Sequence, residues 1–398
     1  MRLRSLTMAG IAGLTILAIA APIGTAYLRA GTLIVRLANI GGVWQALGGW
    51  FEGPFTTDEL SIPSRHGPIR ARLYRPNRIR RAVVVTPGVH AFGIDEARLV
   101  GLAGALARLG VAVVTPESPD LMRYAITART VDVVEDTATW LSARRDLARD
   151  GRVGLVGISF SGGLSIVAAG RPSMHSRVAW VLSFGGHSSL PRVMRFLCVG
   201  LEPGRYGPLG GSRLAPGLGD GRTLKPHDYG TAVMLLALAG RVVPIGQAEA
   251  LRQAILIYLE ASCWDLVDKA RANELWEASR MAVARLPEPS ATLLRYVNDR
   301  NVDALGAVLL PYVDHAGVDP DLSPDRSVAP PSPVFVLHGT GDTVIPSAET
   351  LALERYLAPR TRVRVLLSNL ITHAEVDHPP TAREVLDLVG FFGAVLRQ

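Results

Sequence analysis

The sequence predicts an α/β protein with a mostly parallel eight-stranded sheet and helices on both faces. Six short runs of mostly apolar, often β-branched residues are typical of strands buried on both sides. They cover residues 81–87, 111–117, 152–157, 178–184, 333–339 and 361–368. Helical patterns alternate with most of them, which implies right-handed crossovers between parallel strands.

Two further strands precede these runs. Within "DELSIPSRHGPIRARLYRP", residues 58–76, Ile69, Ala71 and Leu73 alternate with more polar side chains. This period of two, beside a turn that contains Gly67, predicts a pair of strands with one half-exposed face. These two strands complete the predicted eight.

A helical cap is expected after the sixth strand. The segment from residue 187 to about 330 starts rich in Gly and Pro and continues with amphipathic stretches, without a strong strand signal. Repeated Pro in residues 323–333 predicts an extended return to the sheet. The expected organisation is an N-terminal segment at 1–50, a core at 51–186 and 331–398, and the cap at 187–330.

The N-terminus predicts a link to the membrane. Residues 5–28 carry no charge, follow two arginines and are long enough to span a bilayer. Small-residue triplets also fit a cleaved secretory signal, but the apolar centre is longer than usual for one, which favours an anchor. Residues 30–51 predict either an interfacial segment or a helix packed on the domain. The protein is thus expected to be membrane-associated or exported.

Composition excludes several partners. The formal net charge of +7 is spread along the chain, and no zinc finger, basic arm or RNA-binding signature accompanies it, so we expect no nucleic-acid partner. A membrane surface remains a plausible electrostatic partner. No nucleotide-binding motif is present, and we expect no cofactor. The sequence leaves open the oligomeric state and whether Cys198 and Cys263 pair.

A candidate nucleophile lies in "VGLVGISFSGG", residues 153–163. A tight turn from a strand into a helix presents one side chain at a strained apex, with small residues two positions before and after it. Ser159 meets this requirement with Gly157 and Ser161, and Ser161 meets it with Ser159 and Gly163. Because the strand ends near residue 157, Ser159 falls in the turn and is favoured, with Ser161 as the alternative.

This stretch resembles the nucleophile elbow of the α/β-hydrolase family, with Ser161 in place of the last Gly of G-x-S-x-G. The resemblance covers most of residues 55–398 apart from the helical insertion. It implies a Ser–Asp–His triad in which the acid follows a later strand and the histidine follows the last strand. The sequence contains both residue types in that order.

The acid is expected to be Asp342. The stretch "PVFVLHGTGDTVIP" is similar to the HG-x-x-D-x-x-(I/V)-P segment of esterases, dienelactone hydrolases and serine peptidases of this fold. A buried carboxylate there would hold one tautomer of the imidazole and stabilise the imidazolium. The alternative is that Asp342 only forms a turn beside Gly341.

Two histidines follow the last strand, in "LLSNLITHAEVDHPP". His373 precedes the final helix and is the favoured general base, whereas the prolines after His378 indicate a stiff helix entry. His378 remains the alternative. Two histidines five residues apart, with no evident third ligand, do not indicate a metal site.

The expected oxyanion hole consists of two backbone N–H groups. One belongs to Phe160, at the start of the helix, and the other to Val89, in the loop after the first buried strand, with His90 next to it. Pro87 and Gly88 stand where the family often has His-Gly, so the sequence leaves open which residue of this loop supplies the second N–H donor. The His90 side chain is either a substrate contact or a structural loop residue.

Weaker candidates are polar residues that either line a pocket or serve the structure. They are Glu117, Asp120 and Tyr124 after a strand, His187 at the start of the insertion, and His227, Asp228 and Tyr229 within it.

These residues together predict a serine hydrolase that cleaves an ester through an acyl-enzyme. An apolar cap beside a membrane suits a lipophilic small-molecule or lipid-like ester. A peptidase or amidase with the same triad is one alternative, and a non-catalytic binding protein of the same fold is another.

Overall fold

The computed structural model describes residues 24–37, 49–200, 224–265, 267–370 and 381–398. Its strands form one eight-stranded sheet in the order β1-β2-β4-β3-β5-β6-β7-β8. β2 runs antiparallel to β1 and β4, and the remaining pairs are parallel. The strands are β1 (Phe55–Ile62), β2 (Ile69–Pro76), β3 (Arg81–Thr86), β4 (Val111–Pro116), β5 (Val153–Ile158), β6 (Val178–Phe184), β7 (Val334–Gly339) and β8 (Val363–Ser368). The predicted fold class is confirmed.

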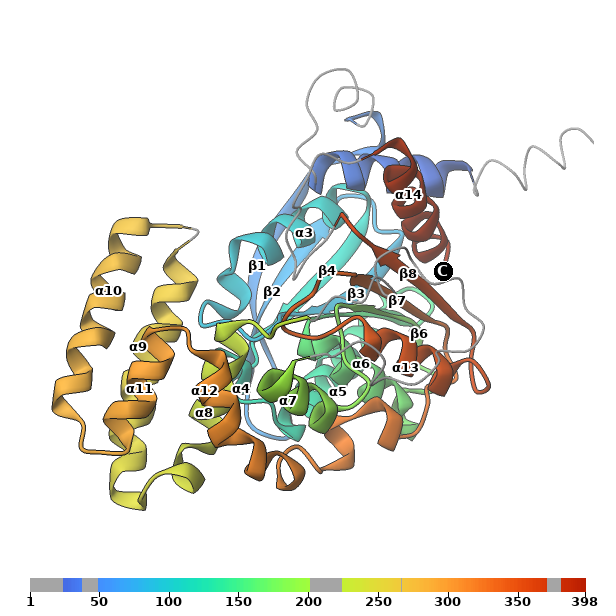
Figure 1. Ribbon diagram of the computed structural model, residues 1–398. Helices are drawn as coiled ribbons and strands as arrows, with labels where there is room; N and C mark the ends of the chain where they lie inside the picture. The colour runs from blue at the N-terminus through green and yellow to red at the C-terminus, as the bar shows by residue number, and fades with distance from the viewer. Residues whose placement is uncertain (1–23, 38–48, 201–223, 266, 371–380) are drawn as a thin grey trace, which may run out of the picture.

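Helices cover both faces of the sheet (Figure 1). α5 (Ala128–Ala143), α6 (Phe160–Gly170) and α13 (Ala348–Leu357) contribute to the core on one face. α3 (Ala97–Arg108), α14 (Ala382–Leu396) and the helix at residues 24–37 contribute to the core on the other. The apolar run of β5 is continuous because Val153 and Leu155 face the first core and Val156 faces the second.

Chain order reverses at the centre of the sheet. β3 lies between β4 and β5, and the crossover that leaves β3 runs to β4 on one side, whereas the crossover that leaves β5 runs to β6 on the other. The carboxyl ends of β3 and β5 therefore flank a topological switch point, where open α/β sheets bind ligands. The predicted nucleophile turn and oxyanion loop both start here.

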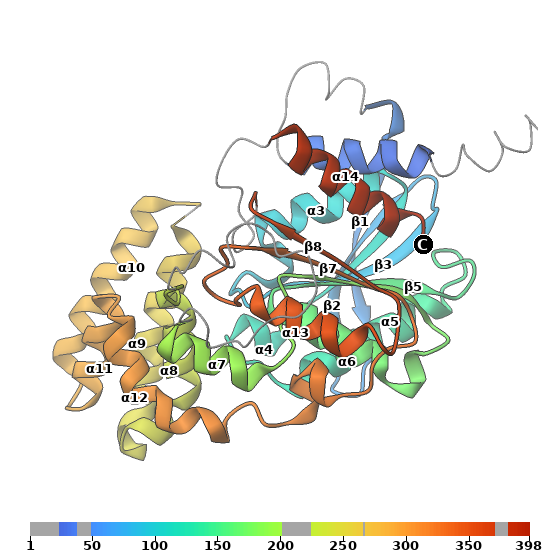
Figure 2. The same cartoon turned by 45° about the vertical axis from the view of Figure 1, so that its right-hand side comes forward.

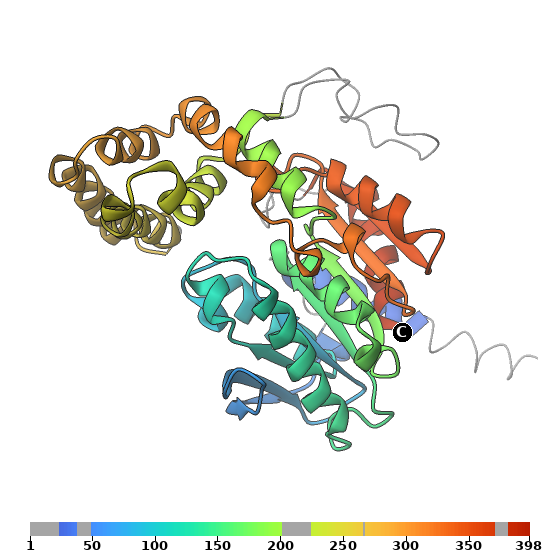
Figure 3. The ribbon, with the colours of Figure 1, turned by 90° about the horizontal axis from the view of Figure 1, so that it is seen from below.

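Helices fill the insertion between β6 and β7, and no strand lies in its described part. They are α7 (Leu190–Val199), α8 (Asp228–Val242), α9 (Ile245–Trp264), α10 (Lys269–Ala282), α11 (Ser290–Asn298) and α12 (Val302–Leu309). Figure 3 shows α8–α11 standing to one side of the sheet. α9 is the centre of this group, and its Leu251, Ile255 and Leu259 are fully buried between neighbouring helices.

Short elements complete the chain. α4 (Pro119–Met122) follows β4, and 3₁₀ turns cover Gly49–Phe51, Gly93–Asp95, Pro172–Met174, Val283–Arg285, Leu310–His315, Pro320–Leu322 and Pro324–Arg326. Cys198 and Cys263 are both buried free thiols, which answers the question of their pairing.

The helix at residues 24–37 lies across α14 (Figure 2). Its Ala30, Leu33 and Ile34 are buried in the core, and the Tyr27 ring packs so closely on Gly393 that a Cβ there would lie 2.3 Å from it. For residues 30–37, the structure therefore shows a helix packed on the domain. Residues 5–23 of the predicted anchor lie outside the described residues. None of the described helices combines the length and the apolar character needed to cross a membrane.

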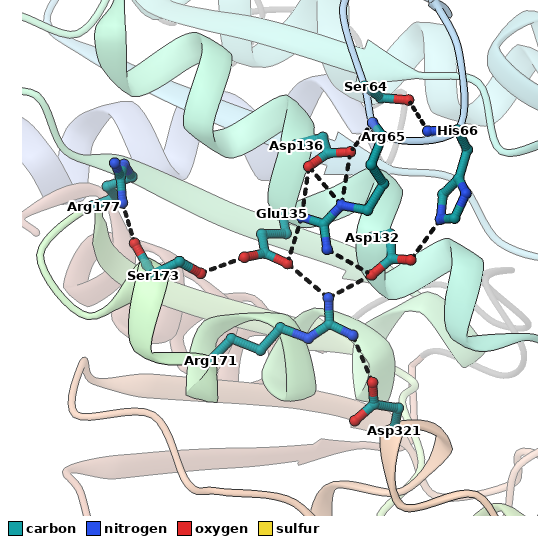
Figure 4. A network of polar contacts seen from close by, with 10 residues as sticks. All are labelled: Ser64, Arg65, His66, Asp132, Glu135, Asp136, Arg171, Ser173, Arg177 and Asp321. Carbon is teal, nitrogen blue, oxygen red and sulfur yellow. Dashed lines mark hydrogen bonds and ion pairs between the residues drawn. The ribbon is translucent and has the colours of Figure 1, made fainter.

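A network of charges ties distant segments together (Figure 4). Arg65, in the turn between β1 and β2, lies 3.1 Å from Asp132, 2.8 Å from Glu135 and 2.7 Å from Asp136, all on α5. Arg171, after α6, approaches Asp132 to 2.6 Å and Glu135 to 2.7 Å. Its other nitrogen lies 2.6 Å from Asp321, in the segment that returns from the cap.

The network shifts the pKa values of its carboxylates. Burial disfavours the charged forms of Asp132 and Glu135, but hydrogen bonds from His66, Ser173 and Arg171 outweigh burial and lower both pKa values. The folded state is thus stabilised at pH values above the ordinary carboxyl pKa, about 3.8 for Asp and 4.5 for Glu. That stabilisation is lost as the pH falls through the lowered values.

We expect Arg171→Met to lower the free energy of unfolding by about 1 to 3 kcal/mol at pH 7, because three partly buried carboxylates lose a partner. Urea unfolding at pH 7 and pH 3 measures the effect, and the difference from the parent protein should shrink at pH 3. Arg177→Met is the matched control, since Arg177 bonds the Ser173 carbonyl and forms no ion pair among the described residues. A difference that is equal at both pH values would contradict the electrostatic explanation.

Candidate active site

Ser159 occupies the apex of the turn between β5 and α6. Its φ is 58° and its ψ is −133°, a conformation that residues with a Cβ rarely adopt. The Ser159 N–H donates to the Phe184 carbonyl at 2.7 Å, and its carbonyl accepts from the Gly162 N–H at 2.8 Å. These bonds to β6 and α6 hold the strained residue in place. The side chain is 8 % exposed.

Small residues make this turn possible. A Cβ on Gly157 would lie 2.2 Å from the Ser161 carbonyl oxygen, so only glycine fits there. The Ser161 hydroxyl is fully buried, accepts from the Ile158 N–H at 2.8 Å and lies 2.9 Å from the Thr86 carbonyl. Ser161 therefore fastens the turn to β3 and β5. The geometry favours Ser159, rather than Ser161, as the side chain presented by the turn.

Asp342 follows β7 and is 1 % exposed. Its Oδ1 accepts from the N–H groups of Val344 at 2.8 Å and Ile345 at 3.0 Å, so the carboxylate also forms a turn. The buried His338 supports the loop, with Nε2 2.8 Å from the Ile345 carbonyl and 3.3 Å from the Asp342 Oδ2. No local sequence pattern marks His338, because its contacts depend on how this loop folds back.

The acid loop adjoins the nucleophile turn. A Cβ on Gly185 would lie 3.7 Å from the Asp342 Oδ2. Gly185 directly follows Phe184, whose carbonyl accepts the Ser159 N–H. The end of β6 therefore lies between the two predicted triad members and holds them in a fixed relative position. His373 and His378 lie outside the described residues, so both remain predictions.

The loop after β3 passes against Ser159. A Cβ on Gly88 would lie 3.4 Å from both the Ser159 Cβ and the Ile158 carbonyl oxygen. Val89 comes next and, together with Phe160, borders a cavity. Both predicted oxyanion residues thus lie beside the turn.

The His90 side chain contacts a residue of its own loop. Its Nδ1 accepts from the Phe92 N–H at 3.2 Å, and its ring packs edge-on against Phe92 with centroids 5.1 Å apart. Burial lowers the pKa of the imidazole, which favours its neutral form. These contacts support the structural alternative for His90.

The cavity that Val89 and Phe160 border has a volume of about 300 Å³, and Phe160 directly follows Ser159 in the chain. Val89, Phe160 and Val344 form its core side, and residues of α7 and α8 such as Leu197 and Val233 form its cap side. Among the described residues that line it, Arg241 alone carries a charge. The surroundings therefore suit an uncharged, apolar group.

The start of α8 connects the cap to the loops that carry Asp342 and Val89. The His227 N–H donates to the Thr343 carbonyl at 2.8 Å, next to Asp342. The Tyr229 hydroxyl donates to the Val89 carbonyl at 2.9 Å. Asp228 accepts from the Tyr258 hydroxyl at 2.5 Å, which fixes α8 to α9. Burial opposes ionisation of Asp228, but hydrogen bonds from His227 and Tyr258 lower its pKa to about 2.

Other weak candidates have structural partners. His187 is fully buried, with Nε2 2.8 Å from the Leu322 carbonyl and its ring packed on Phe160, and burial lowers its pKa. Glu117 pairs with Arg70, and Asp120 accepts from Thr127. The Tyr124 hydroxyl lies 3.3 Å from the Cys263 Sγ, and Tyr124, like Tyr229, also lines the cavity. Among the described residues, no cluster of potential metal ligands occurs.

No protein-family model matches the sequence, and no curated protein matches it. Among solved structures, an esterase from Pyrobaculum calidifontis aligns at 18% identity with a TM-score of 0.46, covering 93% of this chain and 90% of that chain. A thermophilic carboxylesterase cloned from a metagenomic library aligns at 15% with a TM-score of 0.44, covering 87% and 90%. An acylaminoacyl peptidase from Pyrococcus horikoshii aligns at 11% with a TM-score of 0.41, covering 87% of this chain but 46% of that chain.

We expect Gly157→Ala to lower the free energy of unfolding by about 1 to 3 kcal/mol, because the added methyl overlaps the Ser161 backbone. Urea unfolding measures the loss. Gly101→Ala is the control, since Gly101 lies within α3 with nothing within 4 Å of the added Cβ, and alanine should stabilise a helix there by up to about 1 kcal/mol. Equal stability of Gly157→Ala and the parent would show that the turn is looser than described.

Proposed function

We propose that the protein is a serine hydrolase that cleaves carboxylic esters, with Ser159 as nucleophile. The strained apex at Ser159 supports this proposal most directly, since backbone strain that the surroundings maintain is typical of functional sites. The adjoining Asp342 loop, the close passage of Gly88 and the apolar cavity add the other parts that acyl transfer requires.

The proposed reaction proceeds in two halves. Ser159 attacks the ester carbonyl while His373 takes the hydroxyl proton, and His373 then gives that proton to the departing alcohol. Asp342 orients His373 and stabilises its charged form. The N–H groups of Phe160 and Val89 hold the oxyanion. Water, activated by His373, then releases the acid from Ser159.

The cavity supports an ester with an apolar acyl group. Its volume of about 300 Å³ and its nearly uncharged lining fit a short to medium acyl chain. We further propose that residues 5–23 attach the protein to a membrane, which would bring lipid-like esters to this site, since residues 24–28 of the expected anchor belong to the helix packed on the domain.

We expect a fluorophosphonate probe to label Ser159 of the purified protein, mapped by mass spectrometry. His373→Ala should reduce labelling at least about 10³-fold, because the serine loses its base, whereas His378→Ala should label nearly as the parent. Labelling of Ser161, or none on folded protein, would overturn the proposal. A faster turnover of p-nitroanilides than of the matching p-nitrophenyl esters would indicate an amidase instead.

We expect Tyr229→Phe to lower kcat about 10-fold with little change in KM, because the Val89–His90 peptide, next to the proposed Val89 N–H donor, loses the hydrogen bond that holds it. Steady-state hydrolysis of p-nitrophenyl esters measures both constants. Tyr258→Phe is the matched control, since it removes a cap hydroxyl that bonds Asp228 and not the oxyanion loop. If both variants change kcat equally, Tyr229 acts only through the stability of the cap.

A further inference from the structure

A second cavity, with a volume of about 440 Å³, lies on the face of the sheet opposite α6. Val83, Val156, Trp180 and Leu182 supply sheet side chains to its wall, and all four belong to the core that packs against α3 and α14. Leu102 and Leu106 of α3 and Phe392 of α14 add further apolar surface, as does the helix at residues 24–37. Figure 2 shows this helix and α14 lying together over that face. The proposed catalytic turn takes no part in this cavity.

Four arginines also line this cavity: Arg29, Arg80, Arg81 and Arg397. Arg80 and Arg81 lie at the amino end of β3, and Arg397 follows α14. These three are exposed, whereas Arg29 is half-buried. The charges therefore gather where the cavity meets solvent, at the end of β3 remote from the oxyanion loop.

Among the residues that the structure describes, these four arginines have no counter-charge. Within the described ranges, none of them forms an ion pair, and the Arg29 Nε is buried without a hydrogen-bond partner. Burial and the charge of Arg80 lower the pKa of Arg29. Elsewhere in the chain, partly buried arginines such as Arg171 and Arg192 contact two or more carboxylates. A partly buried cation without a partner is costly, and an anion at this position would supply the missing counter-charge.

We propose that this cavity binds an amphiphile with one apolar chain and an anionic phosphate or carboxylate head group. The chain would lie along Val156, Trp180 and Leu182, and the head group would pair with Arg29 and Arg80. The volume falls within the range of about 300 to 1,000 Å³ that is usual for small-molecule sites. This inference does not depend on the proposed hydrolysis, because the two cavities share no lining residue.

Calorimetric titration of the full chain with dodecyl phosphate, below its micelle concentration, tests the proposal. We expect one molecule to bind per chain, with inorganic phosphate and dodecyl maltoside each binding at least about 10-fold more weakly, since each lacks half of the recognised chemistry. Absence of dodecyl phosphate binding would overturn the proposal. The same result is expected if another segment of this chain fills the cavity.

Substitutions locate the binding. Arg29→Gln combined with Arg80→Gln should weaken dodecyl phosphate binding at least about 10-fold, because two charge-assisted hydrogen bonds are lost. Arg241→Gln, which changes the cavity that Val89 and Phe160 border, is the control and should bind as the parent does. Weaker binding to Arg241→Gln with unchanged binding to the double variant would overturn the assignment to this cavity.

A thermal scan separates binding from a purely structural role. Without ligand, the double variant should have a Tm equal to or above that of the parent, because Arg29 is an uncompensated cation. A lower Tm would indicate that Arg29 and Arg80 serve folding, and would overturn the proposal.

Co-sedimentation with phosphatidylcholine vesicles, with and without phosphatidic acid, distinguishes the source of the ligand. Binding to the acidic vesicles that dodecyl phosphate displaces indicates a membrane lipid, and no vesicle binding indicates a free amphiphile.

Discussion

The contact between Gly157 and the backbone of Ser161 governs the geometry of the candidate site. The two segments approach so closely that a side chain at position 157 would occupy the place of a carbonyl oxygen. This closeness forces the chain through the positive φ at Ser159, and the buried Ser161 hydroxyl closes the turn by bonding Ile158 and Thr86. Because β3, β5, β6 and α6 all meet at this turn, their positions fix the surroundings of the Ser159 hydroxyl before any substrate arrives.

The cap is joined to this centre by two hydrogen bonds from neighbouring residues of α8. The His227 N–H bonds the loop that carries Asp342, and the Tyr229 hydroxyl bonds the loop that carries Val89. The same helix supplies much of the apolar wall of the cavity. The apolar wall of the cavity and the position of the Val89 loop thus depend on the same helix. Changes in the cap are therefore expected to alter selectivity and rate together.

The sheet and the position of Ser159 could be predicted from sequence because both depend on local patterns. Strands buried on both faces read as continuous apolar runs, and a tight turn demands small residues at fixed spacing. The bond from Tyr229 to Val89 joins residues 140 positions apart, and the bonds from Arg65 to α5 join residues about 70 apart, so no local pattern marks them. Residues 30–37 were ambiguous because one apolar helix face fits a membrane surface and a protein core equally well. The general base stays a prediction.

Burial of β5 on both faces has a consequence for the evolution of this protein. Val153 and Leu155 pack in the core beneath α6, Val156 lines the second cavity, a Cβ at Gly154 would lie 2.3 Å from the Trp180 ring, and the end of the strand carries the Ser159 turn. These positions of the strand are therefore held by different neighbours, and replacement at one demands a matching change elsewhere. Divergence among relatives should then be slowest in this strand and fastest on the outer surface of α10, where most side chains face solvent and from which neither cavity draws its lining.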